Sequence, residues 1–274
     1  QDKFFDGVID NFIETYAEGK TPVPCIQCNQ TVKFTDLLNE AKKMNADTLV
    51  TGHYVRRIGG QTNAKLFKAK DKFKDQSYFL FATLKEQLDY VRFPLGDYLK
   101  TEIREMAKIF NLKVSDKPDS QDICFVTSNS YRDLINKLKP ELNIEGDFID
   151  HEGNILGKHK GITNYTIGQR KGIGIGGKEH PLYVINIDKK KNEITLGVQS
   201  FLKKNAITLN KINWLDENIS KKNLKCFAKI RSTQIETPGT LNIKSNSGEF
   251  IFDDEINTTS PGQACVFYLN NQVL

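Results

Sequence analysis

The apolar pattern changes near the middle of this chain, and the change limits which folds the chain can adopt. Residues 1–18 carry apolar side chains at helical spacing, and residues 32–44 and 99–110 repeat that spacing. After Gly146 the apolar segments become short and strand-like, at residues 147–150, 182–187, 193–197, 225–231, 239–244, 249–252 and 264–268. The pattern predicts an α/β domain, then a small central domain, then a C-terminal antiparallel β-barrel.

The first half is expected to alternate strands and helices. Residues 46–54 read as a buried parallel strand, and the apolar residues 79–81 follow a polar stretch, with the helix 99–110 after them. Ile103, Met106, Ala107 and Phe110 should share one face of that helix, with Asn111 as its stop. Ser130 should cap one further short helix, which Pro140 ends.

Composition excludes several classes of protein. The chain has 274 residues, enough for two or three domains, and its net charge is 39 − 34 = +5, which is compatible with a polyanionic partner but decides little. No apolar run approaches the length of a membrane span, which is about 18 residues. Five cysteines are too few, and odd in number, for a secreted disulfide scaffold. We therefore expect a protein of the cytoplasm.

The cysteines fall into two groups. Cys25, Cys28 and Cys124 lie in polar, Pro- or Asp-rich sequence, the usual setting of reactive thiols, whereas Cys226 and Cys265 lie in apolar runs and read as strand residues. Cys28 should precede the N-terminus of the helix 32–44, where free N–H groups favour a thiolate. The residues alone permit a zinc half-site, a thioredoxin-like dithiol, or a pair of thiols, Cys28 and Cys124, that acts on a substrate.

Two other segments could bind a ligand. Gly52 and His53 end the predicted strand 46–54, where α/β sheets bind ligands, although His53 also reads as an ordinary loop histidine. The glycines of 172–177 match a dinucleotide or Walker loop only superficially, because Glu179 stands where a hydroxyl is needed and a strand rather than a helix should follow. Gln169, Arg170 and Lys171 before that loop could contact phosphates or belong to a solvated hairpin.

Motifs along the whole chain resemble one known family. They are Thr-Pro-x-Pro-Cys-x-x-Cys-Asn at 21–29 with Lys33-Phe34, Thr-Gly-His-Tyr at 51–54, Lys-Asp-Gln-Ser-Tyr-Phe-Leu at 74–80, Pro-Leu-Gly at 94–96, Ser-Gln-Asp-Ile-Cys-Phe at 120–125, Gly-x-His-x-Gly at 157–161, Tyr-Thr-Ile-Gly-Gln-Arg-Lys-Gly at 165–172 and Pro-Gly-Gln at 261–263. Together they resemble the tRNA-specific 2-thiouridylase family (MnmA/TrmU).

The resemblance implies a fold and a chemistry. The fold is a Rossmann-like α/β domain of the PP-loop ATPase, or adenine nucleotide alpha hydrolase-like, type at 1–128, truncated at its start, a small tRNA-binding central domain at 129–198 and a β-barrel at 199–274. The family uses ATP with Mg²⁺ to adenylate O2 of the wobble uridine, position 34, and replaces that oxygen with sulfur. The sulfur arrives as a persulfide from a sulfur-relay protein or cysteine desulfurase, and the other partner is the anticodon arm of tRNA.

The resemblance also implies roles for single residues. Cys124 would carry the persulfide, and Cys28 would be the nucleophile that ends in a disulfide with Cys124. Gly52 would contact ATP. No metal ligand is assigned. The residues implied to contact tRNA are Val23, Pro24, Cys25, His53, Lys74, Asp75, Gln76, Arg231, Ser232 and Gln263.

Two departures from the family pattern matter. Some members have an acid at the position of Cys25, so a general acid/base role there would fall to Cys25 or to water. The family's Ser-Gly-Gly-x-Asp-Ser loop for pyrophosphate does not occur in the sequence. We therefore expect that these 274 residues alone do not adenylate uridine. The alternatives are a non-catalytic module that binds tRNA or a sulfur carrier, and a zinc-stabilised tRNA binder.

Overall fold

The computed structural model describes residues 2–117, 123–126, 130–177, 179–219, 222–257 and 260–274. Its contacts divide the chain into two compact units, and each is described by itself. Unit 1 consists of Gln1–Pro24, Asp122–Ile207 and Phe252–Ala264, and unit 2 consists of Cys25–Gln121, Thr208–Ile251 and Cys265–Leu274. Because the chain enters each unit more than once, distant sequence motifs lie in the same unit.

Unit 1 opens with the helix that apolar spacing predicts at residues 1–18. Its segments are α1 (Asp2–Phe4), the π-helical η1 (Phe5–Asp10) and α2 (Asn11–Ala17). Gly19 follows with φ of +70°, and its N–H donates to the carbonyl of Tyr16 at 2.9 Å. This left-handed residue ends the helix, as predicted, because glycine adopts positive φ without a Cβ clash.

A second helix of unit 1, α7 (Tyr131–Leu138), shares a core with the first. Ser130 Oγ accepts a hydrogen bond from Arg132 N at 3.2 Å, which confirms the predicted helix cap, and Pro140 begins the 3₁₀ turn η4 (Pro140–Leu142). Phe12, Ile13, Tyr16 and Ile135 are the buried residues of this core, and Ile123 and Phe125 pack against them. The segment around Cys124 is thereby fastened to the helices.

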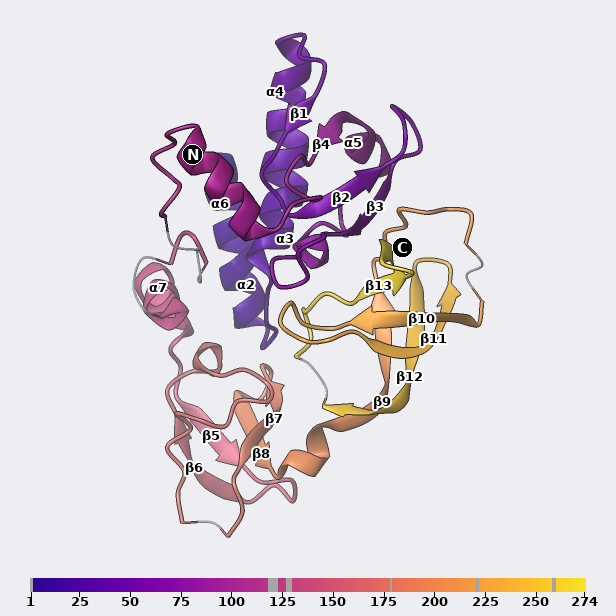
Figure 1. Ribbon diagram of the computed structural model, residues 1–274. Coiled ribbons are helices and arrows are strands. Elements are labelled where there is room, and N and C mark those ends of the chain that lie inside the picture. The colour runs from indigo at the N-terminus through magenta and orange to yellow at the C-terminus, as the bar shows by residue number, and fades with distance from the viewer. Residues whose placement is uncertain (1, 118–122, 127–129, 178, 220–221, 258–259) are drawn as a thin grey trace. The chain divides into compact units, whose positions relative to one another are not determined.

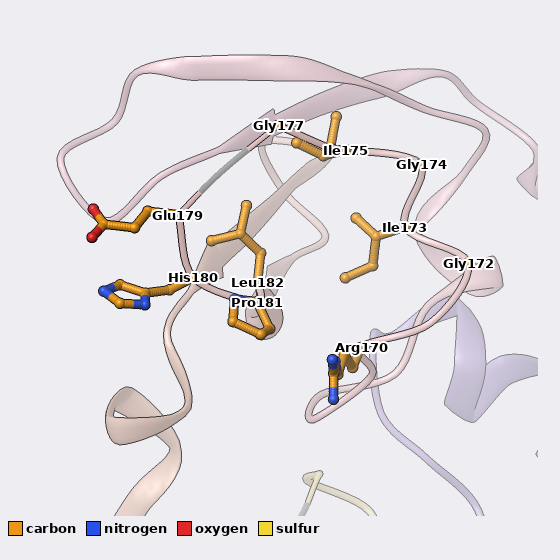
Figure 2. Close-up of a pocket in the computed structure, with 11 residues that line it drawn as sticks. Arg170, Gly172, Ile173, Gly174, Ile175, Gly177, Glu179, His180, Pro181 and Leu182 are labelled. Atoms are coloured by element: carbon orange, nitrogen blue, oxygen red, sulfur yellow. The ribbon is translucent and has the colours of Figure 1, made fainter.

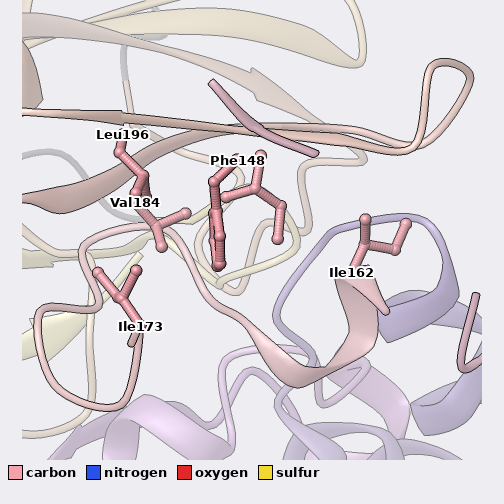
Figure 3. Packing of buried hydrophobic residues seen from close by; sticks show 6 residues of the cluster. Phe148, Ile162, Ile173, Val184 and Leu196 are labelled. Carbon is pink, nitrogen blue, oxygen red and sulfur yellow. The ribbon is translucent and has the colours of Figure 1, made fainter. Parts of the chain in front are cut away.

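The central sheet of unit 1 has four strands in the order β6-β5-β8-β7 (Figure 1). Their bounds are β5 (Gly146–Ile149), β6 (Ile155–His159), β7 (Tyr183–Asp188) and β8 (Glu193–Gly197), with the 3₁₀ turns η5 (Ile162–Asn164) and η6 (Gln199–Leu202) beside them. β7 and β8 pair antiparallel across residues 189–192, as predicted. The core gathers Phe148, Ile162, Ile173, Val184, Ile194 and Leu196 (Figure 3).

A long helix beginning at Pro24 organises the first part of unit 2. It consists of α3 (Pro24–Cys28), the π-helical η2 (Asn29–Leu37) and α4 (Leu38–Lys43). The sequence predicted a helix only from about residue 32, with Cys28 just before its N-terminus, and this prediction is wrong. Proline suits the first position of a helix because its missing N–H would be unpaired there anyway, so the helix starts at Pro24 and encloses Cys28.

A parallel pair of strands follows the long helix. β1 (Leu49–Val50) pairs with β4 (Val91–Arg92), which confirms a parallel strand within residues 46–54 but a much shorter one. Val50 is 58% exposed, so the strand is not buried as predicted. Among the described residues β4 is the strand that pairs with β1, and the two form a two-stranded sheet.

The apolar residues 79–81 do not form a strand. The 3₁₀ turn η3 (Ser77–Phe79) occupies this region, and Tyr78 and Leu80 are each only 1% exposed. Two helices follow, α5 (Lys85–Tyr90) and α6 (Lys100–Ile109). α6 and the left-handed Asn111 after it, with φ of +52°, confirm the helix predicted at 99–110. Phe110 follows the last residue of α6 and is 71% exposed, and none of the residues of α6 is buried.

The largest sheet has eight strands in the order β2-β3-β14-β13-β10-β11-β12-β9. Their bounds are β2 (Val55–Ile58), β3 (Lys65–Lys68), β9 (Lys203–Asn210), β10 (Leu224–Lys229), β11 (Thr237–Lys244), β12 (Ser247–Asn257), β13 (Val266–Leu269) and β14 (Gln272–Val273). Figure 1 shows β10 and β11 side by side. The strands predicted near residues 225, 239, 249 and 264 are confirmed, although Cys265 lies one residue before β13.

The β2–β3 hairpin joins the C-terminal strands within unit 2. Phe67 of β3 is paired with Gln272 of β14. Lys65 Nζ lies 2.6 Å from Asp216 Oδ2, and Gln272 Nε2 donates to the same oxygen at 2.8 Å. Asp216 is buried, and its neighbours hold its pKa below the ordinary value, chiefly through the hydrogen bond from Lys65. Strands far apart in the sequence are therefore held as one body.

Candidate active site

The long helix that begins at Pro24 carries two thiols in different settings. Cys25 lies in the first turn of α3 and is exposed, whereas Cys28 is the last residue of α3 and is half-buried. The N–H groups without an intrahelical partner belong to the first turn of a helix. The favourable field that the sequence assigned to Cys28 therefore acts more strongly on Cys25.

Two buried residues of this helix, Asn29 and Phe34, fix its position. Asn29 is 3% exposed, and its Nδ2 donates to the carbonyl oxygen of Phe79 at 3.0 Å. Phe34 is fully buried, and its ring lies 6.1 Å from that of His53 and 6.2 Å from that of Phe93. The Cys-Asn motif and the Lys-Asp-Gln-Ser-Tyr-Phe motif are thus neighbours in space.

A cavity of about 380 Å³ lies beside this helix. It is lined by Lys33, Thr51, Gly52, His53 and Gln76. Lys33 comes from η2, and Gly52 and His53 follow the carboxyl end of β1, the place where parallel sheets bind ligands. The structure therefore places the predicted Gly52, His53 and Gln76 around one cavity and adds Lys33 and Thr51.

His53 is a neutral residue in this cavity. Its Nδ1 lies 2.9 Å from Thr51 Oγ1. Burial, together with the charge of Lys33, lowers the pKa of His53 to about 4. At neutral pH the imidazole can exchange hydrogen bonds but carries no charge, so Lys33 is the cation that lines this cavity.

Gly52 leaves the rim of the cavity open. It is exposed, and a Cβ at this position would meet only Leu95 Cδ1, at 3.6 Å, an ordinary contact. The local fold therefore does not require glycine here for space. The absence of a side chain instead leaves the backbone accessible.

The Lys74-Asp75-Gln76 segment is held by its own side chains. Asp75 Oδ1 accepts hydrogen bonds from Ala69 N at 2.9 Å and Ser77 N at 3.3 Å, and Asp75 Oδ2 accepts one from Ser77 Oγ at 2.7 Å. Gln76 Oε1 accepts from Tyr54 N at 2.8 Å. These oxygens are committed to the turn, so their contribution to a ligand site is to position Lys74 and the amide group of Gln76.

Cys124 is exposed, and its neighbours in sequence are anchored. Ile123 and Phe125 pack into the core of unit 1, and the Phe125 ring lies 5.4 Å from that of Phe12. Residues 120–122 of the Ser-Gln-Asp-Ile-Cys-Phe motif lie outside the described residues. Cys28 belongs to unit 2 and Cys124 to unit 1, so their pairing stays a prediction.

The predicted contacts in the C-terminal part lie in loops. Arg231 and Ser232 follow β10, with Arg231 exposed and Ser232 half-buried. Gln263 Nε2 donates to the carbonyl oxygen of Thr21 at 3.1 Å, and Thr21 N donates to that of Pro261 at 2.8 Å. The Pro-Gly-Gln loop therefore holds the segment that leads into Val23 and Pro24, of which Val23 is half-buried and Pro24 buried.

A second cavity, of about 440 Å³, lies in the glycine-rich loop of unit 1. Figure 2 shows Ile173 and Leu182 turned into the space that the loop surrounds. Gln169 Oε1 accepts from Thr166 N at 3.2 Å and Gln169 Nε2 donates to the carbonyl of Lys171 at 2.9 Å, so this side chain holds its own turn. The strand β7 follows the loop, which confirms that it is not a Walker loop.

The two C-terminal cysteines are structural. Cys226 is 4% exposed in β10, and burial raises its pKa to about 12. Cys265 is half-buried, and burial raises its pKa as well. All five cysteines belong to the described residues and none of them forms a disulfide. Within the described ranges, no group of three or more His, Cys, Asp or Glu side chains could hold a metal ion. No helix in the described part is long and apolar enough to cross a membrane.

Comparison with known proteins defines the class of each part of the chain. Residues 1–128 match the tRNA methyl transferase HUP domain, residues 132–198 the tRNA methyl transferase PRC-barrel domain, and residues 204–274 the aminomethyltransferase beta-barrel domain. These matches confirm the predicted fold class, a Rossmann-like α/β domain followed by a small central domain and a C-terminal β-barrel.

Curated relatives are similar over nearly the whole chain. The tRNA-specific 2-thiouridylase MnmA of Ehrlichia ruminantium (strain Gardel) is 49% identical over 273 residues, which is 99% of this chain and 73% of the relative. The proteins of the same name from Orientia tsutsugamushi (strain Boryong) and Rickettsia conorii (strain ATCC VR-613 / Malish 7) are 50% and 48% identical, over 100% of this chain and 74% of each relative. The chain belongs to the tRNA-specific 2-thiouridylase MnmA family, a family of enzymes.

Lys33, Thr51 and Asn29 are site residues to which the sequence assigned no role. Lys33 lies on the same continuous helix as Cys28 and lines the cavity. The hydrogen bond of Asn29 reaches Phe79, fifty residues away, and no local pattern indicates it.

Proposed function

We propose that this chain carries the sulfur-transfer and tRNA-binding parts of an ATP-dependent enzyme that converts the wobble uridine of tRNA, position 34, to 2-thiouridine. The observation that carries the proposal is the cavity of unit 2, where Lys33 extends from the helix of Cys28 to meet Gly52 and His53. The names of the MnmA relatives support tRNA as substrate and thiolation as reaction.

The cavity suits an anionic group of the activated substrate. ATP, as its Mg²⁺ complex, supplies the adenylyl group that converts uridine O2 into a leaving group. Lys33 supplies a positive charge, and the open backbone of Gly52 lets the substrate approach closely. His53 is neutral and can exchange a hydrogen bond with the substrate. Electrostatic stabilisation of this kind is strongest where the cation is partly removed from water.

The cysteines carry the sulfur. The terminal sulfur of a persulfide on Cys124 attacks C2 of the adenylated uridine, and AMP leaves with the former O2. The thiolate of Cys28 then attacks Cys124 Sγ, so that a Cys28–Cys124 disulfide forms and the sulfur on C2 leaves as 2-thiouridine. A dithiol reductant restores both thiols, and a sulfur-relay protein or cysteine desulfurase reloads Cys124.

The residues implied to contact tRNA fall into two groups in the proposal. Residues whose side chains hold the backbone, Asp75 and Gln263, act by positioning Lys74 and the segment of Thr21. Those proposed to face the anticodon arm are Val23, Pro24, Cys25, His53, Lys74, Gln76, Arg231 and Ser232. The reaction would take place in the cytoplasm, where tRNA is modified.

A single-turnover assay tests the proposal. The full-length protein is mixed with tRNA transcript, ATP and a cysteine desulfurase with cysteine, which supplies persulfide sulfur. Formation of 2-thiouridine, diphosphate and AMP is measured for the wild type, Cys28→Ser and Cys124→Ser. We expect both substitutions to lower thiolation by about 10³-fold or more, since a missing nucleophile cannot be replaced by its neighbours. Adenylation, measured as diphosphate release, should continue in both variants because it precedes the sulfur chemistry.

Cys226→Ala is the matched control, because this thiol is buried in β10 and outside the proposed chemistry. It should thiolate at the wild-type rate once its folding has been checked by thermal melting. Wild-type thiolation by Cys28→Ser or Cys124→Ser would contradict the assigned roles. Binding of tRNA by the wild type without any 2-thiouridine or AMP would favour the non-catalytic binding module, and stoichiometric zinc would favour the zinc-stabilised binder.

A further inference from the structure

Phe73 is the most exposed large hydrophobic side chain of the described residues, at 96%. It lies between Lys72, which is exposed, and Lys74, which is half-buried. An isolated exposed apolar residue needs no explanation by itself. Phe73 differs from an ordinary surface residue because the backbone that carries it is fixed.

Asp71 holds the turn of Phe73 from one side. Asp71 is 9% exposed, its Oδ1 accepts a hydrogen bond from Phe73 N at 3.0 Å, and its Oδ2 accepts one from Lys100 N at 3.0 Å. The carbonyl oxygen of Asp71 accepts from Lys74 N at 3.1 Å. The backbone of Phe73 is thus tied to the start of α6.

Asp75 holds the turn from the other side, through Ala69 N and the backbone and hydroxyl of Ser77. Both carboxylates of this turn therefore face backbone N–H groups or a hydroxyl of their own chain. What the turn offers to solvent is an aromatic ring and the ammonium group of Lys72. A ring on a fixed backbone loses little conformational freedom when a ligand packs on it.

We propose that Phe73 stacks on an unpaired nucleobase of the tRNA, with Lys72 beside a phosphate. This inference rests on the proposed function, because it assumes that RNA is the substrate. An aromatic ring among lysines is the combination that binds single-stranded nucleic acid, where the ring packs on a base and the cations follow the backbone. The turn also supplies Gln76 to the cavity, so the stacked base would lie close to the reacting uridine.

The exposed ring of Phe73 has no apolar neighbour in its turn, and this favours RNA over a protein as the partner. Lys72 and Asp71 flank Phe73 on one side and Lys74 and Asp75 on the other, so the turn itself offers no second apolar residue to a protein surface. A protein interface usually needs a contiguous apolar centre. A base presents a single flat face, for which one ring suffices.

Binding of a tRNA transcript to the full-length protein, measured by fluorescence anisotropy, tests the inference. Phe73→Ala should weaken binding about 5- to 100-fold, the range found for the loss of one stacked base. Phe110→Ala is the matched control, an equally simple loss of an exposed ring, and should leave tRNA affinity unchanged. Thermal melting should not change in either variant, because both rings are largely exposed.

Two further readouts separate stacking from charge. Phe73→Ala should leave the slope of log Kd against log salt unchanged, whereas Lys72→Ala should reduce that slope by about one ion. Phe73→Trp should keep wild-type affinity, and its indole fluorescence should be quenched when tRNA binds. The wild type, whose single tryptophan within these 274 residues is Trp214, gives the background signal.

Wild-type affinity of Phe73→Ala together with an unquenched Phe73→Trp would overturn the inference and leave the cysteine chemistry untouched. A loss of binding to the sulfur-donor protein, with tRNA binding intact, would also overturn it and assign the turn to a protein partner. If the wild type itself fails to bind tRNA, the proposed function fails first and this inference with it.

Discussion

Burial shifts the pKa of titrating groups both beside the helix that begins at Pro24 and in the C-terminal strands, with different consequences. In the first region His53 is kept neutral at the edge of a cavity of about 380 Å³, beside a lysine and on the same body as Cys28. In the second, Cys226 is kept protonated inside a strand, where it only fills space. A shifted pKa therefore indicates chemistry only where the group also meets a space that a substrate can enter.

Alkylation should show the contrast between the two regions most strongly. At pH 8 a thiol of pKa about 12 is thiolate in about one molecule in 10⁴, so Cys226 should react with iodoacetamide about 10³-fold more slowly than an unperturbed thiol. Burial adds steric protection. Mass spectrometry of the folded protein should find Cys25 and Cys124 labelled before Cys226 and Cys265. Labelling of all five cysteines at the same rate under native conditions would contradict the difference between the exposed and the buried thiols.

The second largest effect should be the loss of folding stability that His53 causes at acid pH. Between pH 6.5 and about 4 the unfolded chain binds a proton at this histidine and the folded protein does not, so stability falls as the pH falls through this window. The loss approaches about 3 kcal/mol at its lower end. Urea unfolding at several pH values should show a shallower pH dependence for His53→Gln than for the wild type.

The difference between the wild type and His53→Gln isolates this residue, because other titrating groups are common to both proteins. His159, whose pKa is also lowered by burial, contributes with the same sign to each. Identical pH profiles for the two proteins would mean that the pKa of His53 is the same in the folded and the unfolded state. His53 would then be a second cation at this cavity below about pH 6.5.

The smallest difference between the two regions should be in the free energy of unfolding of single cysteine variants. Cys226→Ser places a hydroxyl in an apolar strand core and should lower the free energy of unfolding by about 1 to 3 kcal/mol. Cys25→Ser changes an exposed side chain and should stay within about 0.5 kcal/mol of the wild type. Denaturant melts of both variants measure the difference, and equal losses would show that the first turn of α3 is packed as tightly as β10.

Local patterns predicted those elements whose signals are complete within a short stretch. The helix to Ala17 with Gly19 after it, α6 with Asn111 after it, the cap at Ser130 and the β7–β8 hairpin all follow from spacing and turn residues. The prediction failed at Pro24, where proline signals either a loop or the first residue of a helix. Only the packing of Asn29 and Phe34 resolves that ambiguity in favour of the helix.

Residue type and order in the sequence were enough to predict the fold class and the family, and to set the exposed Cys25 and Cys124 apart from the buried Cys226. The contacts of individual polar groups came from the tertiary structure. Lys33 and His53 line one cavity, the carboxylate of Asp75 accepts a hydrogen bond from Ala69 N, and the side-chain amide of Gln263 donates to the carbonyl oxygen of Thr21. The physical reason is that a buried polar atom must find a partner wherever the fold supplies one, and that partner can be 242 residues away, as between Gln263 and Thr21.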